Sequence, residues 1–186
     1  SGARVVRLEA GRSLVVSHDL PIRARITDAR PDAPYLAVVL TIDMTIVRSL
    51  YDEVGHLVDA APEGHALAVH DADPKLVDAI ARTLALADDP VESRVLLPLL
   101  RREVHFRLLM APHGAMLRQL LRHDSQASSV ARAIGHLRAN FRTTIAVPDL
   151  ARVAGMSASS LHKHFQAITA TSPLQFQKDL RLLEAR

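Results

Sequence analysis

Polar side chains able to contact a ligand gather near the carboxyl end of the chain, in the run ASSLHK that begins at Ala158. His162 and Lys163 follow Ser159 by three and four positions, so a helix would place all three on one face. A hydroxyl, a ring donor and a cation on one helical face suit the major groove of DNA, where lysine donates to guanine and serine bonds several base edges. We therefore predict that Ser159, His162 and Lys163 contact base edges.

Neighbouring polar residues suit the DNA backbone. Because helix amino termini bind anions, we predict that Ser157 and Ser160, at the start of the same helix, contact phosphates. Arg152 lies in the segment just before and is predicted to contact a phosphate from a first helix. The competing interpretation of this spacing is an ordinary helical hairpin with a solvated polar face.

Residues 149–165, DLARVAGMSASSLHKHF, have the residue types that two short helices crossing at a tight turn require. Ala151 is small enough for the crossing, Gly155 tolerates a positive φ in the turn, and Ser157 can cap a helix that begins at Ala158. The segment is therefore predicted to be a helix-turn-helix. Its expected inner surface consists of Leu150, Val153, Met156, Leu161 and Phe165.

A second cap follows, in which Thr171 and Ser172 precede Pro173 at the first position of a further helix. From residue 149 to Arg186 the chain resembles the DNA-binding region of AraC-type transcriptional regulators, as the ending SPLQFQKDLRLLEAR shows most sharply. That family has two helix-turn-helix units joined by a long linker helix, so the resemblance implies that Pro173 begins the linker and that the second unit is absent. Ala170 stands where the family usually has glycine, and we expect it either to avoid a positive φ or to bear a small cost.

The upstream segments GRSLVVSHDLPIRARITDARPDAPYLAVVLTID and HGAMLRQLLRHDSQASSVARAIGHLRANF resemble the amino-terminal sensor type of the same family. The resemblance implies an α+β fold, in which a partial cupin-like β-sandwich or barrel layer packs with helices and precedes an all-α helix-turn-helix unit. Family sensors begin with further β-strands, so we expect this β-layer to be incomplete. The polar run over residues 122–129 marks the expected boundary between a sensor and oligomerisation domain, residues 1–124, and a DNA-binding domain, residues 125–186.

The period of the apolar residues changes along the chain. Residues 13–17, 23–27 and 35–42 run apolar or alternate in short pieces between turns, which predicts strands. After Asp43 the pattern becomes helical, with a helix through Val54, a loop over residues 55–71, and further helices that begin after Asp73 and Asp89. The expected inward residues are Leu76, Val77, Ile80 and Leu84 in the helix after Asp73, and Val130, Ile134, Leu137 and Phe141 in a helix over residues 125–141.

The helix expected after Asp89, with the sequence VESRVLLPLLRREVHFRLLM, is apolar on more than one face. One face either meets another subunit, which predicts a homodimer, or packs with the rest against the β-layer and the neighbouring helix. Pro98 removes one backbone donor and should kink this helix or mark a break.

Composition and charge restrict the class of protein. The chain has 186 residues and is 48% hydrophobic, enough for the core of one or two domains. Residues 129–186 hold 8 Lys or Arg against 3 Asp or Glu, a net charge of +5, whereas residues 1–128 hold 15 against 17, a net charge of −2. Positive charge is thus concentrated where phosphates would be approached. The sequence contains no apolar run of about 18 residues that predicts a membrane span, and the lack of cysteine fits a reducing cytoplasm.

Ten histidines raise the question of a metal-dependent enzyme of the cupin type. Such a site needs clustered histidines and a carboxylate on adjacent strands, yet only His18 lies in the predicted strand region. His56, His65 and His70 are scattered through a predicted loop. Because the sequence also has neither a Gly-rich phosphate loop nor a nucleophile elbow, we predict no catalytic residue, no metal and no cofactor.

These observations together predict a cytoplasmic transcription regulator whose partners are double-stranded DNA, a small-molecule effector and a second copy of the chain. No membrane partner is expected. The alternative is a protein–protein interaction module that dimerises without binding DNA.

Overall fold

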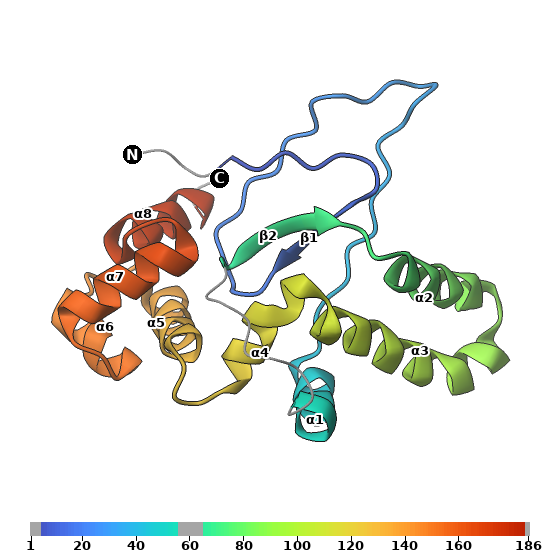
Figure 1. Ribbon diagram of the computed structural model, residues 1–186. Helices are drawn as coiled ribbons and strands as arrows, with labels where there is room; N and C mark the ends of the chain where they lie inside the picture. The colour runs from blue at the N-terminus through green and yellow to red at the C-terminus, as the bar shows by residue number, and fades with distance from the viewer. Residues whose placement is uncertain (1–4, 56–64, 185–186) are drawn as a thin grey trace.

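The computed structural model describes residues 5–55 and 65–184. A small sheet lies in the middle of the molecule, with helices below it and on both sides (Figure 1). Strands β1 (Arg12–Val16) and β2 (Leu67–Asp71) pair antiparallel, so that the first residue of β1 lies opposite the last residue of β2. Within the described ranges this two-stranded sheet is accompanied by one isolated bridge, between Arg30 and Ala33.

Helices account for most of the regular structure. They are α1 (Met44–Val54), α2 (Pro74–Ala85), α3 (Pro90–Met110), α4 (Ala115–Leu121), α5 (Gln126–Asn140), α6 (Val147–Ala154), α7 (Ala158–Thr169) and α8 (Pro173–Glu184), with short 3-10 turns at Leu86–Asp88 and Pro112–Gly114. The carboxylates of Asp43, Asp73 and Asp89 accept hydrogen bonds from backbone N–H groups in the first turns of α1, α2 and α3. The three helix starts predicted at these aspartates are therefore confirmed.

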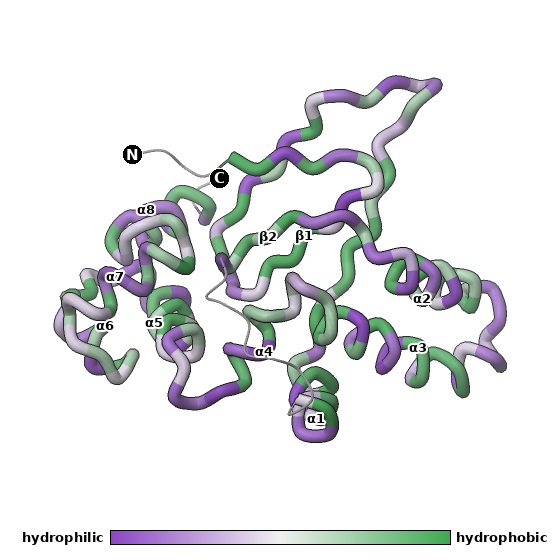
Figure 2. Tube along the Cα trace, in the orientation of Figure 1, coloured by the Kyte–Doolittle hydropathy of each residue, from purple (hydrophilic) through white to green (hydrophobic). Residues whose placement is uncertain are grey.

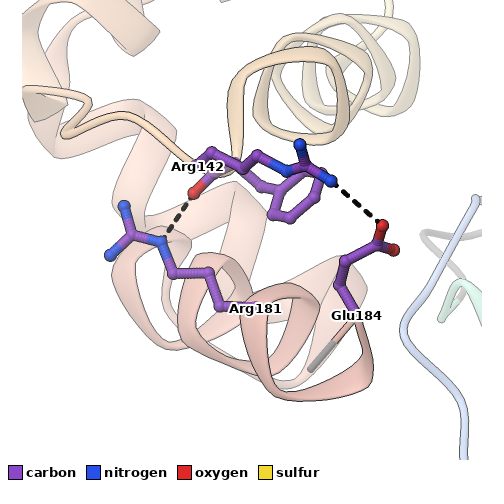
Figure 3. Close-up of a pocket in the computed structure, with 4 residues that line it drawn as sticks. Arg142, Arg181 and Glu184 are labelled. Carbon is purple, nitrogen blue, oxygen red and sulfur yellow. Dashed lines mark hydrogen bonds and ion pairs between the residues drawn. The ribbon is translucent and has the colours of Figure 1, made fainter. Parts of the chain in front are cut away.

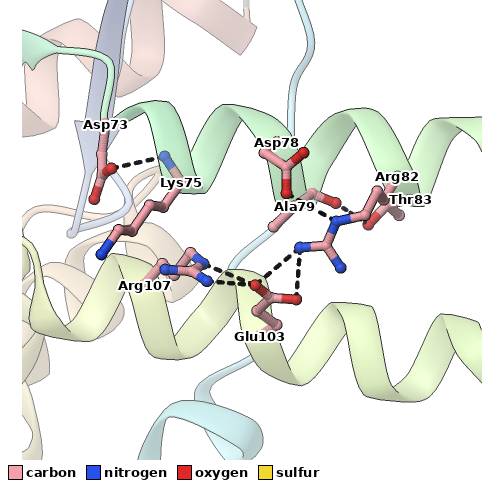
Figure 4. Close-up of polar contacts among 8 residues, drawn as sticks. All are labelled: Asp73, Lys75, Asp78, Ala79, Arg82, Thr83, Glu103 and Arg107. Atoms are coloured by element: carbon pink, nitrogen blue, oxygen red, sulfur yellow. Dashed lines mark hydrogen bonds and ion pairs between the residues drawn. The ribbon is translucent and has the colours of Figure 1, made fainter.

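Glu103 on α3 links α2 to α3. Its carboxylate accepts hydrogen bonds from Arg82 on α2, at 2.8 and 2.9 Å, and from Arg107 on α3, at 2.6 and 2.9 Å (Figure 4). The two guanidinium groups, Arg107 foremost, lower the pKa of Glu103 below its usual value. Because all three side chains are partly exposed, the contact aligns the two helices but adds little net free energy.

Two apolar clusters form the interior. The first joins the sheet to α1–α4 and contains Leu109 and Leu117, both at most 1% exposed. The second lies mainly within α5–α8, where Val130, Ile134 and Leu137 of α5 are at most 2% exposed, as predicted from their spacing. Figure 2 shows apolar and polar residues alternating along the helices.

Two of the three predicted strands are wrong. Residues 13–17 largely coincide with β1, but residues 23–27 and 35–42 form no strand, and residues 67–71, predicted as part of a loop, form β2. A strand needs a hydrogen-bonded neighbour, and in the described ranges neither segment has one. Apolar side chains are left at the surface, with Leu36 86% and Val39 90% exposed. The described residues therefore form no cupin-like sandwich or barrel, and the fold is mixed but mostly helical.

Two finer predictions also need correction. On α2, Leu76 and Ala79 are buried, but Val77 and Leu84 are 49% and 53% exposed, because the core and α3 cover only one side of this helix. We predicted a kink or a break at Pro98; α3 is continuous through this residue, so the break is absent, and the kink remains a prediction. Since Pro98 is exposed, the carbonyl that loses its partner there can bond water.

The sheet and the C-terminal helices are joined by main-chain hydrogen bonds at Ala66. The carbonyl of Ala66 accepts a hydrogen bond from the N–H of Ser17, at 2.9 Å, just after β1. The N–H of Ala66 donates to the carbonyl of Ile168, also at 2.9 Å, in the last turn of α7. Beside this link His65 Nδ1 lies 3.0 Å from the carbonyl of Ala167.

A second contact joins the segment after β1 to α5. His18 is 5% exposed, and its Nε2 lies 3.3 Å from the carbonyl of Ala127. Asp19 forms a 2.5 Å ion pair with Arg138, near the other end of α5. Both contacts cross the division predicted between residues 124 and 125, which falls in the connection between α4 and α5. The division itself remains a prediction.

Burial lowers the pKa of His18 below its usual value of 6.5, and the hydrogen bond with the Ala127 carbonyl opposes this effect. As pH falls through 6.5, the unfolded chain therefore binds more protons at this position than the folded chain, and the free energy of unfolding decreases. We expect His18→Gln, which retains a donor for Ala127, to reduce the loss of stability between about pH 7.5 and about pH 5.5 in urea denaturation. Equal losses in the variant and the original chain would contradict this assignment.

Candidate nucleic-acid interface

The turn predicted at Gly155 is confirmed. α6 ends at Ala154, and Gly155 has φ 70° and ψ 34°, a left-handed conformation that glycine adopts without steric penalty. Its N–H donates to the carbonyl of Arg152 at 3.1 Å, and the N–H of Met156 donates to the carbonyl of Ala151 at 3.0 Å. Met156, predicted on the inner surface, is partly buried there. The chain thus turns sharply between α6 and α7.

Ser157 caps α7, which begins at Ala158 as predicted. The Oγ of Ser157 accepts a hydrogen bond from the N–H of Ser160 at 3.2 Å. The same hydroxyl donates to Oγ of Ser160 at 3.0 Å and lies 3.1 Å from Oγ of Ser159. The hydroxyl of Ser157 is therefore already engaged in starting the helix, and the phosphate contacts of Ser157 and Ser160 remain predictions.

Leu161 and Phe165 anchor α7 to the rest of the C-terminal helices. Both side chains are completely buried, and the ring of Phe165 meets that of Phe176 on α8 edge to face, with ring centroids 5.4 Å apart. Leu150 of α6 is 1% exposed in the same cluster. Val153 was predicted to join them, and this is wrong: it is 40% exposed, because the buried side of α6 runs through Leu150 and its small alanines instead.

The opposite side of α7 faces solvent. Ser159, His162 and Lys163 are all exposed there, which base contact would require, although the contact itself remains a prediction. Gln166, three residues beyond Lys163, is also exposed and lies on the same side. We did not predict Gln166 from the sequence, although its seven-residue spacing from Ser159 was an available signal. We call these four residues the reading face; together they offer hydroxyl, ring, ammonium and amide groups suited to base edges.

Arg152, predicted to contact phosphate, lies on α6 with an ion-pair partner. Its Nη1 is 3.0 Å from Oδ1 of Asp149, one turn earlier, and its side chain is 78% exposed. An exposed ion pair of this kind has a small net free energy, so a phosphate could replace Asp149 at little cost. The phosphate contact remains a prediction.

Arg132 of α5 contacts the turn between α6 and α7. Its Nη2 donates to the carbonyl of Ala154, the last residue of α6, at 2.8 Å, and to Oγ of Ser129 at 2.8 Å. The contact joins residues 22 positions apart, so no local pattern in the sequence indicated it.

The loop between α5 and α6 is fixed from the other side by α8. Gln177 donates to the carbonyls of Phe141 and Thr143, at 3.1 and 2.6 Å, and Arg181 donates to the same two carbonyls at 2.6 and 2.8 Å. Figure 3 shows Arg181 bonded to the loop in this way while Glu184 pairs with Arg142 at 3.2 Å. The helices that carry the reading face are thus held together by polar contacts as well as by apolar burial.

Residues suited to metal binding do not gather in the part of the chain that the structure describes. In residues 5–55 and 65–184 no group of three or more His, Cys, Asp or Glu side chains is arranged to hold a metal ion. His56, considered in the sequence as a ligand, lies outside the described residues. In the same ranges no helix has the length and apolar character needed to cross a membrane.

Comparison with known families agrees with the resemblance found in the sequence. A family model described as the AraC-type transcriptional regulator N-terminus matches residues 1–116, more than half of the chain. The chain therefore belongs to the family of AraC-type transcriptional regulators. Comparison with curated proteins and with solved structures gives no match.

Ala170, directly after α7, has φ 60° and thus bears the cost expected for alanine at a positive φ. We expect Ala170→Gly to raise the free energy of unfolding by about 0.5 to 1 kcal/mol, because glycine adopts this conformation without strain. Urea denaturation measures the change. The matched control is Ala167→Gly, inside the last turn of α7, which should lower the free energy of unfolding by about 1 kcal/mol. A loss of stability in Ala170→Gly would show that position 170 carries no strain.

Proposed function

We propose that this chain is an effector-responsive regulator of transcription that binds double-stranded DNA in a sequence-specific manner, with α7 in the major groove. The observation that carries the proposal is the reading face, exposed on a helix whose opposite side is buried through Leu161 and Phe165. The turn at Gly155 and the cap at Ser157 fix where that helix begins. These features match the way a recognition helix enters the groove.

The residue types of the reading face suggest specific contacts. Lys163 would donate to guanine acceptors, Gln166 would pair with adenine through its amide, and Ser159 and His162 would contact further base edges. Ser157, Ser160 and Arg152 would contact the phosphates on either side. The net charge of +5 over residues 129–186 supports approach to a polyanion.

The proposal assigns different roles to the two parts of the chain. Residues 1–124 would sense a small-molecule effector and support oligomerisation, and residues 125–186 would bind DNA. Family membership supports both roles in general, since the matched region is the N-terminal region of transcriptional regulators. We further propose that the protein acts in the cytoplasm, without a catalytic activity or a cofactor.

We also propose that the chain forms a homodimer through α3. Val91, Val95 and Leu99 are spaced four residues apart on this helix and are 79%, 65% and 61% exposed. Such a spacing places the three side chains along one side of the helix. An exposed apolar stripe on a long helix is typical of a surface that a second subunit covers.

A dimerisation module that does not bind DNA is the competing function. The exposed stripe on α3 favours this competing function. A module that only dimerises, however, leaves the composition of the reading face without a role. The two functions differ in their response to salt, because DNA binding through several phosphates weakens steeply as salt rises whereas an apolar dimer does not.

Selection of bound sites from random double-stranded DNA tests the proposed function. We expect the chain to enrich a defined motif, and we expect Lys163→Ala to weaken binding to that motif by about 1 to 3 kcal/mol, because a base contact is lost. A mobility-shift titration measures the difference.

The control for this variant is Lys178→Ala, which removes the same charge from an exposed position on α8. It should change affinity much less than Lys163→Ala. Equal affinities of Lys163→Ala and the original chain would refute the contact, and failure to enrich any motif would favour the dimerisation module.

The proposed dimer has its own test. Val95→Lys places a charge in the middle of the stripe, and we expect the dimer to dissociate, because an ammonium group is costly to bury without a partner. Light scattering coupled to size exclusion measures the molar mass. Leu182→Lys, at another exposed apolar position on α8, is the matched control and should leave the dimer intact. A dimer that persists in Val95→Lys would place the interface elsewhere.

A further inference from the structure

A guanidinium group on a different helix, α5, donates a hydrogen bond to a carbonyl at the end of α6. The carbonyls in the last turn of a helix lack intrahelical partners and must find others. Gly155 and Met156 supply N–H groups to the carbonyls of Arg152 and Ala151. The carbonyl of Ala154 is instead bonded at 2.8 Å by the guanidinium of Arg132. A positive charge at this position also interacts favourably with the helix dipole.

The guanidinium lies directly against the turn. A Cβ atom built on Gly155 would stand 3.5 Å from Nη2 of Arg132, which is ordinary contact distance. The same Nη2 donates to Oγ of Ser129, one turn earlier on α5, at 2.8 Å. Ser129 therefore restrains the direction in which the arginine extends, and the arginine restrains the point at which α6 ends and the chain turns toward α7.

The helix that carries Arg132 is itself firmly held. Ala133 and Ile134, next to it, are at most 2% exposed, so the backbone at residue 132 is anchored in the apolar cluster. The segment that follows β1 contacts α5 on both sides of this position, His18 at Ala127 and Asp19 at Arg138. Because the backbone at residue 132 is fixed, the side chain of Arg132 can hold the turn between α6 and α7 in a defined position.

We propose that Arg132 is a positioning residue for DNA recognition. By holding the carbonyl of Ala154 it sets the angle between α6 and α7, and with it the direction of the reading face, without contacting DNA itself. This inference rests on the proposed function, since the direction of the reading face matters only if α7 enters a groove. Its contact with the turn can nevertheless be measured in the absence of DNA.

Three variants test the role of Arg132. Arg132→Met removes the donors and keeps much of the aliphatic side chain, Arg132→Lys retains a single donor group, and Arg142→Met removes the same charge from an exposed position near α5. Thermal unfolding followed by circular dichroism establishes that each variant is folded. The measurements are the affinity for a selected DNA site relative to an unrelated duplex, the salt dependence of binding, and amide hydrogen exchange at Gly155 and Met156 without DNA.

We expect Arg132→Met to lower the ratio of specific to unrelated affinity roughly three- to ten-fold, the effect of losing one hydrogen bond that fixes geometry. The slope of affinity against salt should stay unchanged, because no phosphate contact is lost. Exchange at Gly155 and Met156 should become faster. Arg132→Lys should change the affinity ratio and the exchange less than Arg132→Met does. Arg142→Met should alter neither the affinity ratio nor the exchange at the turn.

Three results would overturn the inference. A salt slope reduced by about one, with unaltered exchange at the turn, would mean that Arg132 contacts a phosphate directly. Faster exchange with an unaltered affinity ratio would mean that Arg132 holds the turn but that the turn does not affect DNA recognition. If neither the exchange nor the affinity ratio changes, Arg132 has no role in the turn or in recognition. If the original chain prefers no DNA site, the proposed function fails and the positioning role in recognition fails with it, whereas the exchange measurement still reports whether Arg132 holds the turn.

Discussion

The burial of Leu161 and Phe165 determines which side of α7 is available to a ligand. The two side chains lie about one helical turn apart and are completely removed from solvent. Burying large apolar side chains of this kind contributes roughly 1.5 to 3 kcal/mol each. Rotation of α7 about its axis would expose them, so the free energy that stabilises the C-terminal helices also keeps the reading face directed outward. The orientation of this surface therefore depends on the packing of the opposite side of α7.

Local signals were sufficient to predict most of the helical C-terminal part. The turn at Gly155 and the cap at Ser157 act on residues within a few positions, so short stretches of sequence contain the whole interaction, and the same holds for the cap of α1 at Asp43. The sheet could not be predicted from local signals in this way. Residues 35–42 have the apolar composition of a strand, but pairing depends on a partner elsewhere, and the strand that pairs with β1 was hidden in a segment predicted as a loop. Composition indicates the tendency to form a strand, whereas only tertiary structure supplies the neighbour.

In the candidate site too, some residues could be predicted from local sequence, whereas others depend on tertiary structure. Periodicity was enough to place Ser159, His162 and Lys163 on one face, and the same periodicity applied further would have included Gln166. The bond between Arg132 and Ala154 spans 22 positions and depends on how α5 packs against α6, which no repeat in the sequence encodes. The family match covers residues 1–116, so it and the geometry of α6 and α7 come from separate parts of the chain.

The junction at Ala66 has a consequence for which side chains this position accepts. Its two main-chain hydrogen bonds, to Ser17 and Ile168, use peptide groups that every residue other than proline possesses. Side-chain chemistry at this position is therefore irrelevant to the link, but side-chain volume is not, because Ala66 is completely buried. The main-chain link therefore does not depend on which small side chain stands at position 66, while any increase in bulk at this one residue would push the sheet away from the end of α7.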